Sequence, residues 1–234
     1  MISSLYNPIV KHLVKLRQNH DYREEQDSIL ICGATLIDEL SKTFTPKLVL
    51  TKKEVTEEIL QKISGLKTFS DAVAEFSLPK PKQIEKQKWI LVFDAVSDPG
   101  NMGTLLRTAL AFGWEAAYFL DHTVDPFNDK VIRSSRGALF YLPFSHGTLD
   151  DLKKFSHHHN LPILVADTRG KPLLKSQPKK GALLVVSNEA HGPCKKLSHL
   201  GETISIPMTN NVESLNVGVA GSILLYHLKH AHER

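Results

Sequence analysis

Hydrophobic residues along the chain fall into two alternating patterns. Continuous apolar runs bounded by polar or glycine residues predict buried strands, and these runs lie at 28–32, 47–51, 89–93, 116–120, 161–166, 182–186 and 203–206. Apolar residues at helical spacing predict helices, and these segments are an N-terminal one opening on Asn7-Pro8, then 34–42, 55–63, 104–112, 149–155 and 215–228. The alternation of the two patterns predicts an α/β fold.

A polar segment divides this pattern into two parts. Residues 77–88 contain two prolines and are rich in lysine, which is typical of a linker. We therefore predict a small α/β domain over 1–76, a linker over 77–88 and a larger domain over 89–234. In the larger domain the strands separated by helices predict a parallel sheet, with loops gathered at the strand ends.

Composition and charge restrict the function only weakly. The net charge of +4 is divided about equally between the residues up to 88 and those after it, so it permits an acidic partner without requiring one. The only cysteines, Cys32 and Cys194, are far apart and lack metal-ligand spacing, which argues against a disulfide framework or metal site and favours the cytoplasm. The first residues do not form a signal peptide, and no apolar run approaches the roughly 20 residues needed to span a bilayer, so we expect no membrane contact.

The familiar cofactor and hydrolase motifs are missing from the sequence. There is no G-x-G-x-x-G after a strand, no phosphate-binding G-x-x-x-x-G-K-[ST], no G-x-S-x-G and no H-E-x-x-H. The run His157–His159 has no nearby cysteine or acidic partner and is better explained as a surface feature than as a metal site. The common nucleotide-binding, lipase and metalloprotease classes are therefore excluded.

Three polar stretches of the larger domain adjoin predicted strands and helices. In residues 98–113, Asn101 or Thr104 is a candidate helix cap, Gly113 a candidate helix end, and Arg107 points toward the loops. In residues 183–193, an amide and a carboxylate, Asn188 and Glu189, follow a buried strand directly. Each of these features also has an ordinary structural explanation, such as capping or a salt bridge.

The third stretch, residues 204–221, reads as a strand, a polar loop and a helix. Ser214 is a natural N-cap, and the helix after it is apolar on nearly all sides, which predicts burial. Gly218 and Gly221 each cost about 1 kcal/mol relative to alanine inside a helix, so another backbone or a partner subunit should approach closely there. Asn216 is an unexpected polar side chain at the helix start.

Together, these stretches resemble the motifs of the SpoU (TrmH-like) family of RNA ribose 2'-O-methyltransferases, within the SPOUT superfamily. The matching residues are Asn-x-Gly-x-x-x-Arg-Thr-Ala from 101, Asn-Glu-x-x-Gly from 188, and Ile-Pro-Met from 206 followed by Ser-Leu-Asn-Val from 214. Residues 130–138 match the frequent spacer pattern Lys-x-x-Arg-x-Ser-x-Gly-Ala, and residues 7–11 match the family's Asn-Pro-x-Val-Lys start. The chain departs from the family at Ser187, where glycine is usual, and at Cys32-Gly33, where Glu-Gly is frequent.

The resemblance implies a fold and a set of site residues. Relatives form a deep C-terminal trefoil knot, bind S-adenosylmethionine in a bent conformation, and act as homodimers whose sites borrow from both subunits. By similarity, the cofactor-binding residues would be Ser187, Asn188, Gly192, Ile206, Met208 and Leu215. The catalytic residues would be Asn101, Arg107, Glu189, Ser214 and Asn216. We expect Arg107 to act as a fixed cation that anchors a phosphate and stabilises the developing alkoxide, because a guanidinium is a poor base.

The resemblance also implies a structured RNA as the substrate, with ribosomal RNA favoured over transfer RNA, and the separate N-terminal domain favours such an RNA over a free metabolite. Candidate phosphate contacts are Arg133 and Arg136. Lys11 and Arg17 are further candidates, although a solvated helix face is the simpler explanation of these two cations. Two alternatives remain open. The protein could methylate another acceptor, such as tRNA, or it could be a non-catalytic RNA-binding or ribosome-assembly protein that retains the fold.

Overall fold

The computed structural model describes residues 2–66, 71–173, 178, 180–188, 191–209 and 213–230. The chain divides into two compact units. Unit 1 comprises Met1–Pro79 and Phe127–Gly137, and unit 2 comprises Lys80–Pro126 and Ala138–Arg234.

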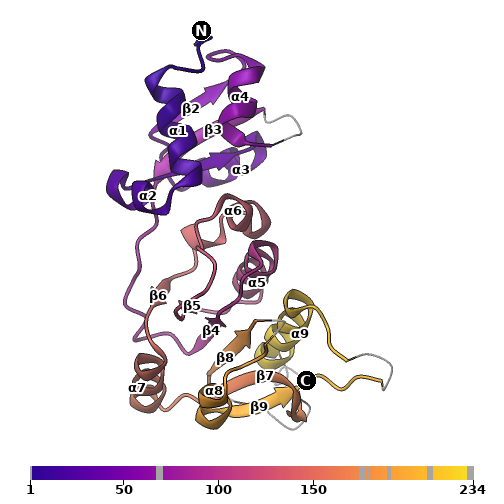
Figure 1. Cartoon of the computed structure of the whole chain (residues 1–234). Coiled ribbons are helices and arrows are strands. Elements are labelled where there is room, and N and C mark those ends of the chain that lie inside the picture. The colour runs from indigo at the N-terminus through magenta and orange to yellow at the C-terminus, as the bar shows by residue number, and fades with distance from the viewer. Residues whose placement is uncertain are drawn as a thin grey trace. The chain divides into compact units, whose positions relative to one another are not determined.

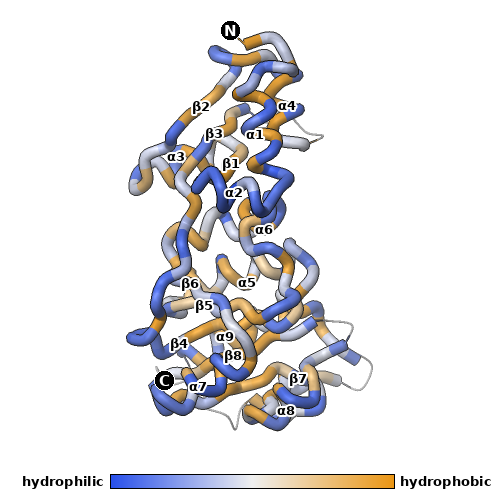
Figure 2. The backbone as a smooth tube through the Cα atoms, turned by 60° about the vertical axis from the view of Figure 1, so that its left-hand side comes forward, coloured by the Kyte–Doolittle hydropathy of each residue, from blue (hydrophilic) through white to orange (hydrophobic). Residues whose placement is uncertain are grey.

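Unit 1 is built on an antiparallel sheet of three strands in the order β1-β3-β2. The strands are β1 (Ser28–Cys32), β2 (Leu48–Thr51) and β3 (Ala72–Ser77). The helices are α1 (Pro8–Gln18), α2 (His20–Gln26), α3 (Ala34–Ser41) and α4 (Glu57–Ser64). Helices α1 and α4 pack together on one face of the sheet, and α3 lies on the other (Figure 2). The predicted elements of this unit are present, but β3 and α2 were not predicted.

The segment Phe127–Gly137 groups with unit 1, although its sequence position lies within the predicted larger domain. Its helix α6 (Asp129–Ser135) contacts β1, and a Cβ atom on Gly137 would lie 3.3 Å from the Leu40 side chain of α3. The predicted linker is also not fully solvent-exposed, because its side chains Leu78 and Ile84 are buried. Neither feature is visible in composition alone.

Unit 2 contains a parallel sheet of six strands in the order β6-β5-β4-β8-β7-β9 (Figure 1). The strands are β4 (Trp89–Asp94), β5 (Ala116–Phe119), β6 (Phe144–His146), β7 (Ile163–Pro172), β8 (Ala182–Ser187) and β9 (Glu202–Ser205). The helices are α5 (Pro99–Ala111), α7 (Leu149–His159), α8 (Lys195–Leu200) and α9 (Val217–His230), with a short 3-10 turn η1 (Ala138–Phe140). The predicted α/β fold with a parallel sheet is confirmed.

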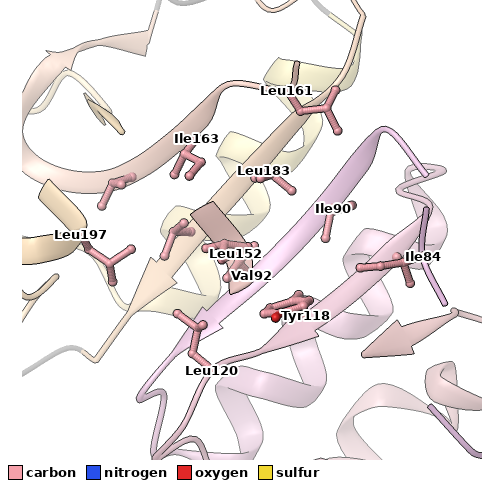
Figure 3. Close-up of a cluster of buried hydrophobic side chains, with 13 residues drawn as sticks. Ile84, Ile90, Val92, Tyr118, Leu120, Leu152, Leu161, Ile163, Leu183 and Leu197 are labelled. Atoms are coloured by element: carbon pink, nitrogen blue, oxygen red, sulfur yellow. The ribbon is translucent and has the colours of Figure 1, made fainter. Parts of the chain in front are cut away.

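Helices cover both faces of this sheet, which explains why its central strands are apolar without alternation. Helices α5 and α9 pack on one face, where α9 contacts β8. On the other face Leu152 of α7 and Leu197 of α8 meet strand side chains such as Ile90, Val92 and Leu183 (Figure 3). At the carboxyl ends of β7, β8 and β9 the chain continues into loops rather than directly into the covering helices.

Two helices begin at positions that differ from the prediction. Helix α5 is capped by Asp98, whose carboxylate accepts a hydrogen bond from Asn101 N–H at 2.8 Å, so Asn101 lies within the first turn. Pro99 favours this earlier start because its fixed φ suits the first helical position. Helix α9 is capped by Asn216, whose side-chain oxygen accepts from Gly218 N–H at 2.9 Å. The prediction that Ser214 caps this helix is therefore wrong.

Helix α9 is only partly buried, in contrast to the prediction. One face packs against α5 and β8, and Gly221 meets the Leu105 side chain of α5 so closely that a Cβ atom would collide with it. The close neighbour that the glycines predict is thus a helix of the same chain. The other face exposes Val219 (52%), Ile223 (41%) and Tyr226 (52%). Across the described ranges, no helix is both long enough and apolar enough to cross a membrane.

Candidate active site

A pocket of about 420 Å³ lies at the carboxyl edge of the sheet in unit 2. The ends of β7, β8 and β9 and the start of α9 form its walls. The lining residues are Ala166, Asp167, Thr168, Arg169, Ser187, Asn188, His191, Gly192, Pro193, Ile204, Ser205, Ile206, Met208, Ser214, Leu215, Val217, Ala220 and Leu224. Its size and mixture of apolar walls with a few polar groups are typical of a small-molecule site, for which volumes run from about 300 to 1,000 Å³.

The six residues proposed from the sequence to bind the cofactor all line this one pocket. They are Ser187, Asn188, Gly192, Ile206, Met208 and Leu215, and the catalytic candidate Ser214 lies among them. They come from two motifs that are separated in sequence but meet because parallel strands end at the same edge of a sheet.

Backbone and side-chain contacts hold the end of β8 in place. Asn188 N–H donates to Asp94 O at 3.1 Å, and its side-chain Nδ2 donates to Ala95 O at 3.1 Å and to Ser97 Oγ at 3.2 Å. The loop then turns back at Gly192, which has φ of +62° and donates to Asn188 O at 2.8 Å. Asn188 therefore ties the second motif to the segment that leads into α5.

The opposite wall depends on a close approach between β7 and β9. The pairing of these strands shifts between Ala166 and Lys171, so β7 bulges where it borders the pocket. A Cβ atom on Gly170 would lie 2.6 Å from the backbone nitrogen of Ile204, which leaves room for glycine alone. Ser205 Oγ donates to Gly170 O at 2.8 Å and closes this contact.

The catalytic candidates Asn101 and Asn216 meet at Gly218. A Cβ atom built on Gly218 would lie 3.0 Å from Asn216 Oδ1 and 3.1 Å from Asn101 Oδ1. The two side-chain amides therefore converge on one point where the first turns of α5 and α9 touch. Within the part of the chain that the structure describes, neither residue lines the 420 Å³ pocket.

The other catalytic candidates are not brought into the pocket of this chain. Arg107 is exposed on the outer side of α5 and is absent from the described pocket lining. Glu189 lies outside the described residues. The first motif thus contributes Asn101 to the junction of α5 and α9, while Arg107 is exposed and does not join the candidate cofactor residues.

A partly buried carboxyl group lies beneath the second motif. Burial raises the pKa of Asp94, and the neighbouring Ser187 hydroxyl lowers it to a lesser extent. Ser187 and Asp94 are paired across β8 and β4. The Ser187 hydroxyl oxygen is nevertheless buried without a well-aligned hydrogen bond among the described residues. It therefore lowers the pKa of Asp94 by less than burial raises it.

The sequence analysis missed the contribution of β7 to the pocket. Asp167 and Arg169 line it, and the Arg169 guanidinium donates from Nε and Nη2 to the two Asp167 oxygens at 3.1 and 2.9 Å. The hydrogen bond from Arg169 lowers the pKa of Asp167. The available signal was the polar Asp-Thr-Arg-Gly sequence directly after the predicted strand 161–166, the same pattern that marked the other loops.

All four cations proposed to contact RNA belong to unit 1. Lys11 is exposed on α1, whereas the Arg17 guanidinium packs over Gly65 at the end of α4. Arg133 donates to Asp129 at 2.6 Å, and Arg136 donates to Glu39 of α3 at 2.6 Å. Exchanging these partly exposed ion pairs for phosphates would cost Arg133 and Arg136 little, because exposed pairs contribute only about 0–1 kcal/mol.

The cysteines differ in their surroundings. Burial raises the pKa of Cys32 to about 12, and Cys194 is exposed. Within the described ranges, no three His, Cys, Asp or Glu side chains are grouped so as to hold a metal ion.

Comparisons with known proteins match the whole chain. The SpoU rRNA Methylase family model matches residues 88–226. The 23S rRNA (guanosine(2553)-2'-O)-methyltransferase RlmP of Bacillus subtilis is 30% identical over 97% of this chain and 98% of its own length. A crystal structure of an RNA 2'-O ribose methyltransferase superposes with a TM-score of 0.85 at 26% identity, covering 100% of this chain and 99% of the other.

The S-adenosylmethionine-bound rRNA methyltransferase of Sinorhizobium meliloti shares the fold. It has a TM-score of 0.87 at 24% identity, over 99% of this chain and 97% of the other. The family match over residues 88–226 spans all three motifs and the pocket, and the chain belongs to the SpoU rRNA methylase family.

Proposed function

We propose that this protein is an enzyme that transfers a methyl group from S-adenosylmethionine to a ribose 2'-hydroxyl of RNA, with ribosomal RNA as the substrate. The observation that carries the proposal is the single pocket at the carboxyl edge of the sheet, lined by all six cofactor residues inferred from the motifs. The names of the relatives support the same reaction, because RlmP of Bacillus subtilis is a 23S rRNA 2'-O-methyltransferase.

The pocket fits S-adenosylmethionine in both size and chemistry. Ile204, Ile206, Met208 and Leu215 offer apolar surfaces for the adenine ring, and backbone groups at Ser187 and Gly192 are available for its polar edge. The close contact between Gly170 of β7 and the backbone of β9 holds these two strands together along one side of the pocket. When bound, the cofactor supplies a methyl group on a sulfonium, which is electrophilic enough for direct attack by an oxygen.

The chain's own residues would then position the ribose and stabilise the negative charge that develops on its oxygen. Asn101 and Asn216 present their amides at the junction of α5 and α9 and would orient the hydroxyl or the loops around it. Ser214 and Glu189 would hold neighbouring groups. Arg107 would act as a fixed cation that anchors a phosphate beside the reacting oxygen.

The exposed position of Arg107 supports a site completed by a second subunit. Arg107 and the exposed Leu110 lie three residues apart on α5, so they share a face of that helix. The adjoining helix α9 exposes an apolar stripe of Val219, Ile223 and Tyr226, spaced for one helix face. Covering this stripe with its copy in a homodimer would bury it and bring Arg107 to the partner's pocket.

The path of the C-terminal segment supports a trefoil knot. Strand β9 is at the edge of the sheet, but α9 packs against β8 and α5 near the middle. The chain must therefore return across β7 after leaving β9. This return path is compatible with a knot, which is rare in proteins, and the two glycines that let α9 lie close to α5 suit tight packing of the C-terminal segment.

We assign substrate RNA binding to the N-terminal domain. Unit 1 gathers Lys11, Arg17, Arg133 and Arg136, and segment Phe127–Gly137 belongs with it, which extends the predicted domain 1–76. A module with its own core and cations suits a large structured RNA better than a free metabolite. The unpaired cysteines suit the cytoplasm, where ribosomal RNA is modified.

The test is methyl transfer from labelled S-adenosylmethionine to unmodified ribosomal and transfer RNA, followed by mapping of blocked 2'-hydroxyls. We expect modification at a ribose of ribosomal RNA. Arg107→Ala should abolish transfer while cofactor affinity, measured by calorimetry, stays within a few fold. Lys154→Ala, a change at an exposed cation on α7, is the matched control and should leave turnover unchanged.

Each alternative gives a different result in the same experiment. Cofactor binding without transfer to either RNA, or no cofactor binding at all, would favour a non-catalytic RNA-binding protein. Transfer to tRNA alone would move the substrate to that class. Near-normal turnover by Arg107→Ala would remove Arg107 from the mechanism.

A further inference from the structure

A highly exposed aromatic side chain stands beside a lysine at the start of α1 in unit 1. Tyr6 is 81% exposed, and its neighbours Leu5 and Ile9 are 36% and 39% exposed. Lys11 Nζ lies 5.6 Å from the centre of the Tyr6 ring, within the range of a cation–π contact. Tyrosine usually buries much of its ring, so this flat apolar surface is available to a partner.

A second lysine, Lys15, lies one turn further along α1, and it contacts a tyrosine of α2, Tyr22, whose ring is fixed by the fold. Lys15 Nζ lies 4.4 Å from the centre of the Tyr22 ring. The Tyr22 hydroxyl is hydrogen-bonded to His12 Nδ1 at 2.9 Å, and His12 Nε2 lies 3.2 Å from Glu75. This contrast separates a structural tyrosine from Tyr6, which is 81% exposed and whose ring has a cation–π contact with Lys11.

The charge around Tyr6 points to an anionic partner. Between residues 3 and 18 the chain carries Lys11, Lys15 and Arg17 and not one acidic residue. Lys11 and Lys15 are four residues apart and exposed, so their ammonium groups follow one side of α1. A partner that fits both the ring and the cations must combine negative charge with a flat apolar face.

We propose that Tyr6 stacks on an unpaired base of single-stranded RNA while Lys11 and Lys15 contact the adjoining phosphates. An unpaired nucleotide offers the required combination, because base–aromatic stacking tolerates any base and the phosphates supply the charge. In a duplex the base faces are covered by their neighbours, so a duplex cannot use the Tyr6 ring. The proposal rests on the proposed function, because RNA is taken as the substrate. It adds that the RNA bound by unit 1 is unpaired and that Tyr6 is the residue that stacks on it.

The test compares binding of the full chain to a labelled single-stranded 12-mer RNA and to its duplex, by fluorescence anisotropy. Stacking contributes about 1–3 kcal/mol per base, so Tyr6→Ala should weaken single-strand binding by about 5- to 150-fold and leave duplex binding unchanged. Tyr6→Phe keeps the ring and should bind within about twofold of the wild type. Tyr141→Ala, at a 44% exposed tyrosine of unit 2, is the matched control and should bind like the wild type.

A salt series tests the lysine separately. Lys11→Ala should reduce the slope of log K against log salt concentration by about 1 if it contacts a phosphate. Wild-type affinity of Tyr6→Ala, an equal loss for Tyr6→Phe, or an equal loss on duplex RNA would each overturn the proposal. If methyl transfer is absent while the Tyr6 effect persists, the proposed reaction fails and the RNA contact stands.

Discussion

Replacing Gly170 by alanine tests whether the contact between β7 and β9 sets the shape of the pocket. The new Cβ atom would lie 2.6 Å from the Ile204 nitrogen and 2.6 Å from the Thr203 carbonyl carbon, roughly 1 Å short of the optimum separation of about 3.5 Å. Both obstructing atoms belong to the backbone, so no side chain can rotate to relieve the collision. Strand β9 must therefore move by several tenths of an ångström or more.

This overpacking should cost about 3 kcal/mol, the upper end of the usual range, because a strand must shift. With about 2–4 °C lost per kcal/mol for a protein of this size, the unfolding midpoint should fall by about 6–12 °C. The two tryptophans of the chain, Trp89 and Trp114, both belong to unit 2, so their fluorescence reports the unfolding of that unit. The displaced wall carries Ile204 and Ser205, so affinity for S-adenosylmethionine should fall at least tenfold.

The matched control is Gly113→Ala, which changes another glycine of unit 2 away from the pocket. Gly113 has φ of +69°, and the nearest atom to its Cβ position is a lysine side-chain carbon at 3.8 Å, so the cost there is backbone strain of about 1–2 kcal/mol without a collision. Its cofactor affinity should be unchanged. A Gly170→Ala protein that unfolds at the wild-type midpoint and binds the cofactor normally would show that the wall is not tightly packed, and the reasoning would be refuted.

Three further predictions concern the dimer, a carboxyl group and a thiol. Ile223→Glu places a charge in the exposed stripe of α9 and should convert a dimer to a monomer in light scattering, whereas Ile9→Glu, at a similarly exposed position of unit 1, should not; an unchanged mass for Ile223→Glu would contradict the shared site. The raised pKa of Asp94 favours folding while the group is protonated, so its stabilising contribution is present below about pH 4 and is lost as the pH rises through the raised value. Asp94→Asn should therefore gain stability relative to the wild type as the pH increases in denaturant titrations, and parallel curves would count against the buried carboxyl. Because the pKa of Cys32 is about 12, mass spectrometry after alkylation at pH 8 should find the label on Cys194 and not on Cys32; labelling of both in the folded protein would mean that Cys32 is accessible and ionised.

Apolar runs predicted every strand of unit 2 except the short edge strand β6, because strands covered on both faces leave a continuous signal in the sequence. Strand β3 of unit 1 (Ala72–Ser77) was missed because Glu75 interrupts its apolar residues and because it stands next to the segment read as a linker. Helix α5 was placed too late because Asp98 and Pro99, which start it, also read as a turn. In each case a local signal was present but had two meanings, and contacts with distant residues selected one of them.

The long-range arrangement of the site was harder to predict than its elements. Resemblance to a family supplied the candidate cofactor residues, and the pocket gathers them. The place of Asp167 and Arg169 in the lining depends on a bulge in β7, and the polar sequence after the predicted strand 161–166 indicated a loop there but not its position against β9. Likewise the exposed stripe on α9 has the composition of a buried helix. The amino-acid composition of a helix face indicates that burial of the face is favourable. It does not show whether the face is buried within the chain or against another copy of it.

The glycines of α9 connect the packing of the fold to the chemistry of the site. Gly221 lets Leu105 approach, so α5 and α9 lie closer than side chains on both helices would allow, and Gly218 then leaves just enough space for the amides of Asn101 and Asn216. A helix interior loses about 1 kcal/mol for each glycine relative to alanine. The chain accepts this loss at two positions of its last helix, and the gain is that two polar side chains from different motifs meet at fixed positions. In their proposed role of orienting one hydroxyl these amides need that rigidity, because a displacement of about 1 Å can cost 100-fold in rate. The same close packing leaves the other face of α9 exposed at Val219, Ile223 and Tyr226, and in the proposed homodimer this face would pack against a second subunit.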